Sequence, residues 1–345
     1  MGQARKKIKH CPRGFYLDIE KEVKNMTRKL NKYFVFSDVH GEVDALMASL
    51  REAGYDHNNP NHFLVSCGDA FDRGPASKEV FDLYLNGRRV IRIKGNHDCF
   101  LEEYLDKGSD GEFVLFNILH NGLGATISSF CSTIDFSNPF SLDTLDQCKG
   151  IQRFRQVREM LKDMPLYFET EHFIFCHAGL NPKLPNWKDT DEHFMLWDIE
   201  HSCDPIPSTD KMVVIGHHHA FRVKNQLIER GAHPEDITGA YYFNKIDQEH
   251  KKILFYGNKD ENSPFKHRNK IALDGLTNLT HKVNVMVVED YPLEEKKDEP
   301  TDNNITDTQF ESCFRDTTFA VNGNMGNFTY TMNYDVGYDD LINMG

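Results

Sequence analysis

The sequence lacks the long apolar run that a membrane-spanning helix requires. Such a helix needs about 20 consecutive, mostly apolar residues, and no stretch of this 345-residue chain approaches that length. The first thirty residues also lack the apolar segment and the small-residue cleavage site of a secretory signal peptide. We therefore expect a cytoplasmic protein that does not associate with membranes.

Paired cysteines are missing as well. The eight cysteines stand singly along the chain, and no two are separated by the two residues typical of zinc knuckles and redox motifs. The scattered positions do not suggest the disulfide framework of a small secreted domain either. We expect reduced thiols and no metal site built from cysteine.

Charge is distributed unevenly along the chain, whose net charge is −13. Residues 1–32 form a basic arm, and residues 291–345 form an acidic, polar tail that we expect to be partly disordered, because its composition cannot supply a core. No aromatic side chains interleave with the basic cluster at residues 5–9, as stacking on nucleic-acid bases requires. Nucleic-acid binding is therefore not expected, and the sequence leaves the oligomeric state open.

Short apolar runs rich in strand-forming residues alternate with polar, glycine-containing segments. Apolar residues at helical spacing follow the first two runs, which gives the order strand, helix, strand, helix, strand. This order predicts an α/β core. The predicted strands cover residues 33–36, 63–65, 90–93, 173–175, 212–215, 253–256 and 283–288.

The predicted domain extends over residues 33–290 and contains two less regular regions. Residues 100–164 read as amphipathic helices, and we expect them to form a cap beside the site. Residues 224–266 form a long polar stretch. This stretch either overhangs the site and selects substrates or is an elaboration with no catalytic role, and the sequence leaves both readings open.

Aspartate, histidine or asparagine follows five of the predicted strands, in each case beside glycine. Ligands of α/β sheets bind beyond the carboxyl ends of the strands, and carboxylate and imidazole groups suit divalent cations. One such residue is ordinary turn chemistry, but five in succession predict a metal site. The segments are Asp38-Val39-His40-Gly41, Gly68-Asp69-Ala70-Phe71-Asp72-Arg73-Gly74, Gly95-Asn96-His97-Asp98, His177-Ala178-Gly179 and Gly216-His217.

The motifs D-x-H-G, G-D-x-x-D-R-G, G-N-H-[DE], H-[AG]-G and G-H, in this order, resemble the signature of the calcineurin-like metallophosphoesterases. The match is closest to their phosphoprotein phosphatase branch of bacterial and phage type, and it covers roughly residues 33–288. The resemblance implies a four-layer α/β sandwich, in which two mixed sheets are flanked by helices, together with a helical cap. Residues 271–274 resemble the family's closing strand. That branch includes protein phosphatases and symmetrical dinucleoside tetraphosphate hydrolases.

The resemblance also implies a dinuclear metal centre. Its first ion would be held by Asp38, His40 and Asp69, and its second by Asp69, Asn96, His177 and His217, so that Asp69 bridges the pair. The motif selects His217 over the two histidines that follow it. The ions would be Mn²⁺, with Fe or Zn as alternatives, because mixed carboxylate and imidazole sites accept all three.

Three further roles follow from the same resemblance. His97 would act as general acid, Asp72 would orient its ring, and Arg73 with Asn96 would bind the phosphate. A local ion pair between Asp72 and Arg73 is the structural alternative. Trp197 is expected to serve packing more than substrate binding.

The function implied is hydrolysis of phosphomonoesters by metal-activated water. A serine/threonine protein phosphatase is the first hypothesis, and a dinucleoside tetraphosphate or nucleotide hydrolase is the second. Both remain open because the metal chemistry does not depend on the part of the substrate beyond the phosphate. An inactive binding scaffold is a third, disfavoured by the complete set of ligand residues. The expected partner is a phosphorylated protein or a nucleotide.

Overall fold

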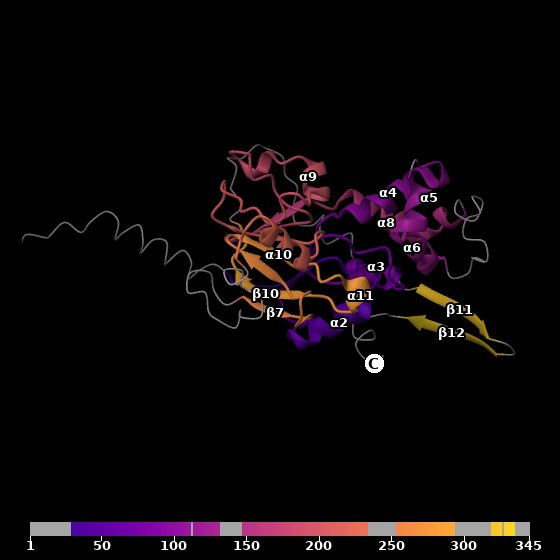
Figure 1. The fold of residues 1–345 in the computed structure, drawn as a ribbon. Helices are drawn as coiled ribbons and strands as arrows, with labels where there is room; N and C mark the ends of the chain where they lie inside the picture. Colours follow the sequence, from indigo (N-terminus) through magenta and orange to yellow (C-terminus); the bar gives the residue numbers. More distant parts are fainter. Residues whose placement is uncertain are drawn as a thin grey trace, which may run out of the picture.

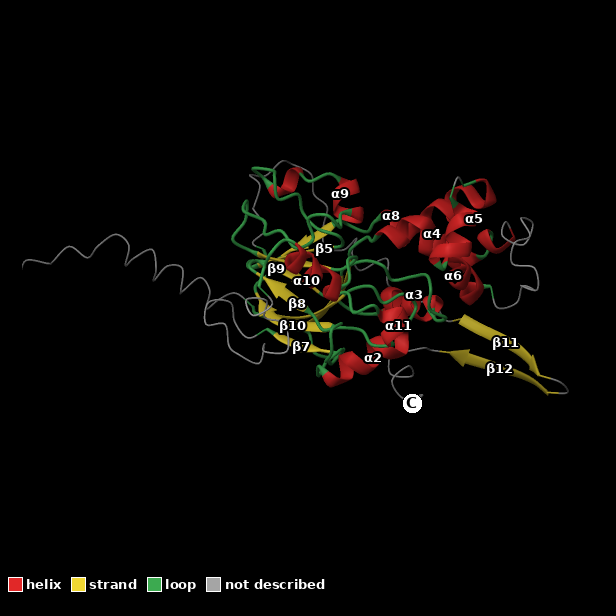
Figure 2. Cartoon of the chain, in the orientation of Figure 1, coloured by secondary structure: helices red, strands yellow, loops and turns green. Residues whose placement is uncertain are grey.

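Two five-stranded sheets stand at the centre of the structure (Figure 1). The computed structural model describes residues 29–111, 113–131, 147–233, 253–293, 319–325 and 328–334. In the first sheet the strand order is β3-β2-β1-β10-β7, and in the second it is β4-β5-β6-β9-β8. Figure 2 shows helices on both sides of these strands.

The first sheet combines three parallel strands with two antiparallel ones. β1 pairs in parallel with β2, and β2 with β3, while β10 and β7 continue the sheet in antiparallel register. Parallel strands at the centre place several carboxyl ends at one edge of the sheet. The strands are β1 (Asn31–Phe36), β2 (His62–Ser66), β3 (Val90–Arg92), β10 (Val285–Asp290) and β7 (Leu254–Tyr256).

The second sheet also contains three adjacent parallel strands, which here lie at its centre. β5, β6 and β9 are parallel, and β4 and β8 are antiparallel edge strands. The sequence analysis missed only the two edge strands of this sheet, because polar side chains interrupt these three-residue segments. The strands are β4 (Tyr167–Glu169), β5 (Phe173–Cys176), β6 (Met212–Ile215), β9 (Lys270–Ala272) and β8 (Phe265–His267).

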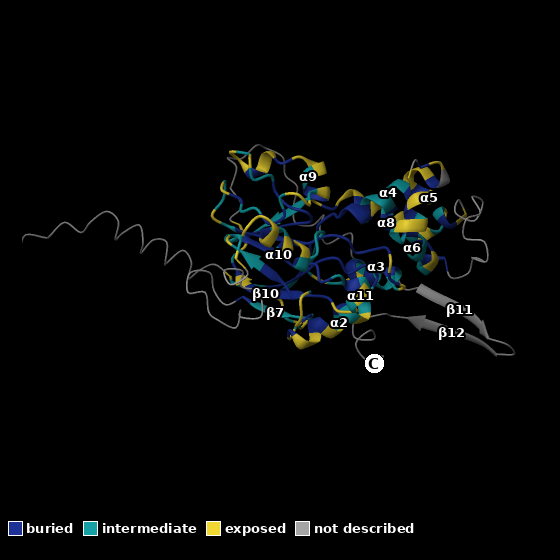
Figure 3. Cartoon of the chain, viewed as in Figure 1, coloured by how far each residue is buried: buried dark blue, intermediate teal, exposed yellow. Residues whose placement is uncertain are grey.

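An apolar core lies between the two sheets. Tyr33 and Val65 of the first sheet belong to the same buried cluster as Phe173, Phe175 and Val214 of the second. The rings of Tyr33 and Phe175 lie 6.5 Å apart between centroids. β10, most of whose residues are buried, is largely dark blue in Figure 3, where this colour marks buried residues. This core holds together the two sheets whose loops form the candidate site.

Helices cover the outer face of each sheet. α2 (Val43–Glu52) and α3 (Ser77–Asn86) pack on the first sheet, and α9 (Glu192–Trp197) and α10 (Ala220–Glu229) pack on the second. The result is the predicted layered order of helices, sheet, sheet and helices. The remaining short helices are η1 (Gly108–Asp110), η3 (Trp187–Asp189) and α11 (Thr277–Thr280).

The region predicted as a cap is helical, but it shares the core of the first sheet. Leu101, Ile127 and Phe154 belong to the same buried cluster as Phe34 and Leu64 of β1 and β2. These helices are therefore fixed to the sheet. They comprise α4 (Asn96–Lys107), α5 (Val114–Phe116), η2 (Asn117–Asn121), α6 (Leu123–Phe130) and α8 (Gln152–Lys162).

The ends of the polar stretch at residues 224–266 belong to the layered domain. Its first residues continue α10, β7 lies at the edge of the first sheet, and β8 begins at Phe265. Its centre, residues 234–252, and the basic arm before residue 29 lie outside the described residues. In the predicted tail, β11 (Phe319–Met325) and β12 (Phe328–Tyr334) form an antiparallel pair that the sequence analysis did not expect. Among the described helices, none combines the length and apolar composition of a membrane span.

Phe175→Ala tests the core between the sheets. Phe175 is fully buried, so the truncation should lower the free energy of unfolding by about 3–5 kcal/mol. Ile174→Val on the same strand is the control, and it should cost about 0.5–1.5 kcal/mol. Urea denaturation measures both. Equal losses in the two variants would contradict a core centred on Phe175.

Candidate active site

The loops that follow β1, β2, β5 and β6 are hydrogen-bonded to one another. The backbone N–H of Asp38 donates to the carbonyl of Gly68 over 3.1 Å, and that of His40 donates to the carbonyl of Asp69 over 3.1 Å. On the second sheet, Gly216 donates to His177 over 2.8 Å. A Cβ atom at Gly216 would collide with the side chains of Ser37 and Asp38, so the glycine allows the two sheets' loops to meet.

Backbone strain is concentrated in these loops. Ten non-glycine residues in the described part of the chain have positive φ, a conformation that L-residues rarely adopt. Six of the ten are residues that the sequence analysis assigned to the site. Such strain persists only where the surrounding structure enforces it, and it is typical of functional sites. The six are Asp38, His40, Asp69, Asp72, Arg73 and His217.

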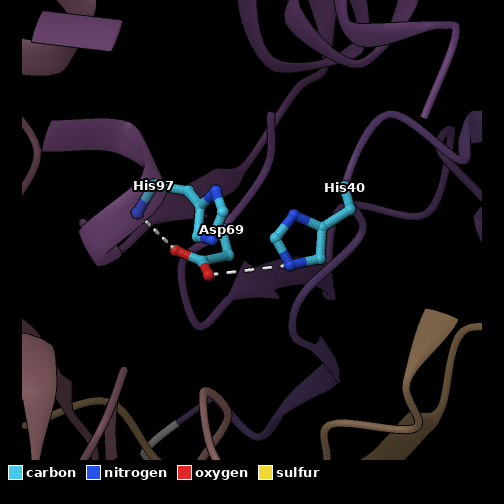
Figure 4. A group of neighbouring side chains, drawn as sticks. All are labelled: His40, Asp69 and His97. Carbon is cyan, nitrogen blue, oxygen red and sulfur yellow. Dashed lines mark hydrogen bonds and ion pairs between the residues drawn. The ribbon is translucent and has the colours of Figure 1, made fainter. Parts of the chain in front are cut away.

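Asp69 lies at the centre of the site. Its Oδ2 atom is 3.7 Å from His40 Nε2, and its Oδ1 atom is 3.3 Å from His177 Nε2. Figure 4 shows the carboxylate of Asp69 between the side chains of His40 and His97. The ligand atoms of His40, Asp69 and His97 lie within 4.8 Å of one another, and so do those of Asp69, His177 and His217. The two oxygens of Asp69 therefore face two different groups of donors.

The tautomers of two histidines are fixed by backbone carbonyl groups. His40 Nδ1 lies 2.8 Å from the carbonyl oxygen of Phe71, and His177 Nδ1 lies 2.8 Å from that of Cys67. A carbonyl oxygen only accepts hydrogen bonds, so each Nδ1 atom carries a proton, and Nε2 is the atom that a neutral ring would offer to a metal. This is the arrangement in which protein histidines bind metals.

Three potential metal-ligand atoms meet at His177. Its Nε2 atom lies 3.3 Å from Asp69 Oδ1 and 2.8 Å from Asn96 Oδ1. On the other side of Asp69, the exposed guanidinium of Arg73 contacts His40 Nε2 at 2.7 Å and His97 Nε2 at 2.9 Å. A cation satisfies a cluster of acceptors of this kind, and the donor set of carboxylate, amide oxygen and imidazole suits a divalent ion.

The electrostatics of the site point the same way. Burial raises the pKa of the Asp38 and Asp69 carboxyl groups well above its usual range, and neighbouring carboxylates add to the shift. Burial also lowers the pKa of His40 well below normal and that of His217 to about 2, so both rings are neutral ligands at physiological pH. Buried carboxylates among neutral rings require a nearby positive charge to remain ionised. The residues present therefore fit two divalent metal ions.

His97 and Asp72 form a hydrogen-bonded pair. His97 Nδ1 lies 2.8 Å from Asp72 Oδ2, and the hydroxyl of Thr126 donates to Asp72 Oδ1 over 2.8 Å. Burial raises the pKa of Asp72 to about 8 and lowers that of His97 well below its usual value. The side chain of Arg73 contacts histidines, whereas that of Asp72 contacts His97 and Thr126. The local Asp72–Arg73 ion pair considered from the sequence is therefore not their main contact.

These loops surround a cavity of about 250 Å³. His40 and His177 are buried behind its lining. Trp197 is 37% exposed and packs against Phe100. It therefore has the packing contact expected from the sequence and also lines the cavity. The residues that line the cavity are Asp38, Asp69, Arg73, Asn96, His97, Phe100, Asn121, Trp197, His217 and His219.

His219 is a residue that the sequence analysis passed over. Its Nδ1 atom lies 2.6 Å from a carboxylate oxygen of the buried Asp274, which leaves Nε2 available as a ligand at the cavity. His218 instead contacts the hydroxyl of Ser202 at 2.6 Å and does not line this cavity. Two features of the sequence could have pointed to His219. It lies two residues after His217, and Asp274, its partner, follows shortly after β9.

Asp98 fastens the third motif to the second. Its Oδ2 atom accepts the backbone N–H of Gly95 over 2.8 Å and that of Asp69 over 3.3 Å. Asp98 is fully buried, and burial raises its pKa to about 6. The carboxylate thus positions Asp69 and the start of α4 and does not itself line the cavity.

The chain is similar in sequence to known proteins that are named for two different activities. The bis(5'-nucleosyl)-tetraphosphatase PrpE [asymmetrical] of Halalkalibacterium halodurans is 26% identical over 160 residues, which are 43% of this chain and 57% of that protein. The serine/threonine-protein phosphatase 2 of Escherichia coli is 35% identical over 82 residues, 24% of this chain and 36% of that protein. The chain thus spans 57% of the PrpE protein's length and 36% of the protein phosphatase's length.

Among solved structures, a metallophosphoesterase from Sphaerobacter thermophilus is similar over 78% of this chain and 90% of its own, with 15% identity and a TM-score of 0.39. The sequence model described as calcineurin-like phosphoesterase matches residues 32–226, which are more than half of the 345 residues. This range contains all five motifs from Asp38 to His217. The chain belongs to the calcineurin-like phosphoesterase family.

Proposed function

We propose that the protein removes phosphate from phosphoserine and phosphothreonine residues of proteins, with two divalent metal ions as cofactors. The observation that carries this proposal is the cluster of acceptors around Asp69, which lies in one cavity with the His97–Asp72 pair and Arg73. The cluster suits a pair of cations, and the other residues suit a phosphate ester. An inactive scaffold has no need of this combination.

In this proposal Asp38, His40 and Asp69 hold one ion, and Asp69, Asn96, His177 and His217 hold the other. His219 supplies a further nitrogen on the side of Asp38 and His40, since all three lie near the buried Asp274. When bound, two such ions would activate a water for attack on phosphorus and stabilise charge on the phosphate oxygens. Mn²⁺ is the ion we propose, because the donors combine carboxylate, amide and imidazole.

The protein's own residues supply the remaining steps. Asp72 accepts a hydrogen bond from the Nδ1–H group of His97 and thereby holds the ring with Nε2 directed at the cavity. A proton at this Nε2 atom is donated to the leaving alkoxide oxygen. The guanidinium of Arg73 is exposed, so it can leave the two histidines and bind nonbridging phosphate oxygens in a bidentate manner.

The size of the cavity supports a substrate that lies mostly outside it. About 250 Å³ is below the range of roughly 300–1,000 Å³ typical of pockets that enclose small ligands. A phosphate on a serine side chain fits such a space while the peptide runs over the surface. The similar protein phosphatase of Escherichia coli is consistent with this substrate class.

A dinucleoside tetraphosphate is the second candidate substrate. The rings of Phe100 and Trp197 lie 5.6 Å apart between centroids at the wall of the cavity, and such rings stack on nucleobases. The similar PrpE proteins are named as asymmetrical hydrolases, whereas the sequence analysis had considered symmetrical ones. The asymmetrical reaction is therefore the alternative to test.

Hydrolysis of two substrates, side by side, separates the candidates. Purified protein with added Mn²⁺ is offered a phosphoserine peptide or diadenosine tetraphosphate, and kcat/KM is measured for each. We expect the peptide to be preferred. A preference for the tetraphosphate would overturn the protein phosphatase proposal and leave the metal chemistry in place, and inactivity on both would support a scaffold.

Asp69→Asn should weaken the binding of both metal ions together, by at least about 100-fold, because the amide replaces the shared carboxylate. Elemental analysis after gel filtration and titration with Mn²⁺ measure this. Asp72→Asn is the matched control, and it should retain both ions while losing turnover. Two equivalents of metal retained by Asp69→Asn would rule out the bridging role.

His97→Asn should reduce the hydrolysis of a phosphoserine peptide by about 10²–10⁴-fold, which is the contribution of a general acid. It should have a much smaller effect on p-nitrophenyl phosphate, whose leaving group needs no proton. His218→Asn is the control, because His218 faces Ser202 and not the cavity. Equal losses on the two substrates would remove His97 from the acid role.

A further inference from the structure

An apolar surface patch lies on the helices next to the active site. We call this surface the cap patch, and it consists of Phe113, Leu115, Phe116 and Leu119. The exposed fractions of these four residues are 55%, 41%, 55% and 57%, respectively. Nine large apolar side chains of the described residues are exposed, and four of them fall within these seven positions. Single exposed apolar residues need no explanation, but a cluster marks an interaction surface.

The patch is the outer face of α5 and η2. Val114 and Asn117, on the inner face, are buried, while the rings of Phe116 and His120 are tilted against each other at 4.7 Å between centroids. Exposed residues on α5 are yellow in Figure 3. Residues 113–121 contain no Asp, Glu, Lys or Arg, although the chain has a net charge of −13. Contact with this surface is therefore governed by apolar burial.

The cap patch is continuous with the active site. Asn121, the last residue of η2, lines the cavity and donates through its side chain to Asn117 Oδ1 over 2.7 Å. The carbonyl of the next residue, Gly122, accepts the backbone N–H of Arg73 over 3.2 Å. Because a helix with its side chains is about 10–12 Å across, the patch lies on the order of 10 Å from the cavity lining.

We infer that the cap patch binds apolar side chains of a phosphoprotein substrate, on the segment next to the phosphorylated residue. This inference rests on the proposed function, which it deepens. An extended peptide covers about 3.3 Å per residue, so a residue about three positions from the phosphoserine reaches the patch. The small cavity holds the phosphate, and the apolar contact outside it then distinguishes one phosphoprotein segment from another.

A nucleotide occupant fits these observations less well. A nucleoside carries polar edges and a ribose that need hydrogen-bond partners, and the four side chains of the patch offer none. The phosphates of a tetraphosphate also favour cationic surroundings, whereas residues 113–121 contain no lysine or arginine. Leucine and phenylalanine side chains of a peptide bury their whole surface against the patch without such losses.

The test compares two phosphoserine peptides that differ only at the positions three residues before and after the phosphoserine, where one carries leucine and the other serine. kcat/KM is measured for wild-type protein, the double variant Phe116→Ser/Leu119→Ser, and Leu279→Ser. Leu279 is the matched control, because it is 68% exposed on α11 and lies outside the patch. p-Nitrophenyl phosphate, which is too small to reach the patch, reports the chemistry alone.

The wild-type protein should prefer the leucine peptide by about tenfold, as expected for partial burial of two apolar side chains. The double variant should lose this preference through a higher KM, with the serine peptide and p-nitrophenyl phosphate unaffected. Leu279→Ser should behave as wild type. Equal rates on the two peptides, or a preference that survives in the double variant, overturn the inference and leave the protein phosphatase proposal intact.

Two other outcomes also count against the inference. If neither peptide is hydrolysed while p-nitrophenyl phosphate is, the proposed function and the inference both fail. If light scattering shows that wild-type protein is dimeric and the double variant monomeric, the patch is an interface between copies of this chain. That result overturns the substrate-binding role.

Discussion

The site depends on one electrostatic constraint, the burial of two carboxylates among neutral imidazoles. Asp38 and Asp69 are 1% and 2% exposed, and burial alone would drive both towards the protonated form. The Nε2 atom of His177 lies beside the carboxylate of Asp69 and the amide oxygen of Asn96. A charge cluster of this kind is costly to bury unless cations compensate it. Metal binding and the stability of the loops are therefore linked, because the ions stabilise only the folded arrangement.

The rest of the structure holds these groups in place. Six site residues adopt positive φ, and such conformations cost of order 1–3 kcal/mol each. The apolar core between the sheets supplies the stability that offsets this strain. Backbone hydrogen bonds from Asp38 to Gly68 and from Gly216 to His177 then fix the loops of the two sheets relative to each other. The fused helical region adds Thr126, whose hydroxyl orients Asp72.

Much of this arrangement could be predicted from the sequence, because each motif combines chemistry with a strand end. Most strands of the two sheets were visible as apolar runs, and glycine beside Asp, His or Asn located the loops. The edge strands β4 and β8 were not visible, because Glu169, Lys266 and His267 interrupt their short segments. His219 and Asn121 were missed because their place in the cavity depends on tertiary packing. The same holds for the cap patch, since sequence periodicity does not show which apolar residues of a helix remain exposed.

We propose that Asp69 bridges two metal ions. Diffraction from crystals of the Mn²⁺-loaded protein, collected near the manganese absorption edge, tests it most directly. If Asp69 bridges the ions, the map should show two anomalous peaks about 3.5–4 Å apart. One peak should lie on the His40 side and one on the His177 side, and each should be coordinated by a different oxygen of Asp69. A single peak, or two peaks that share no ligand, would contradict it.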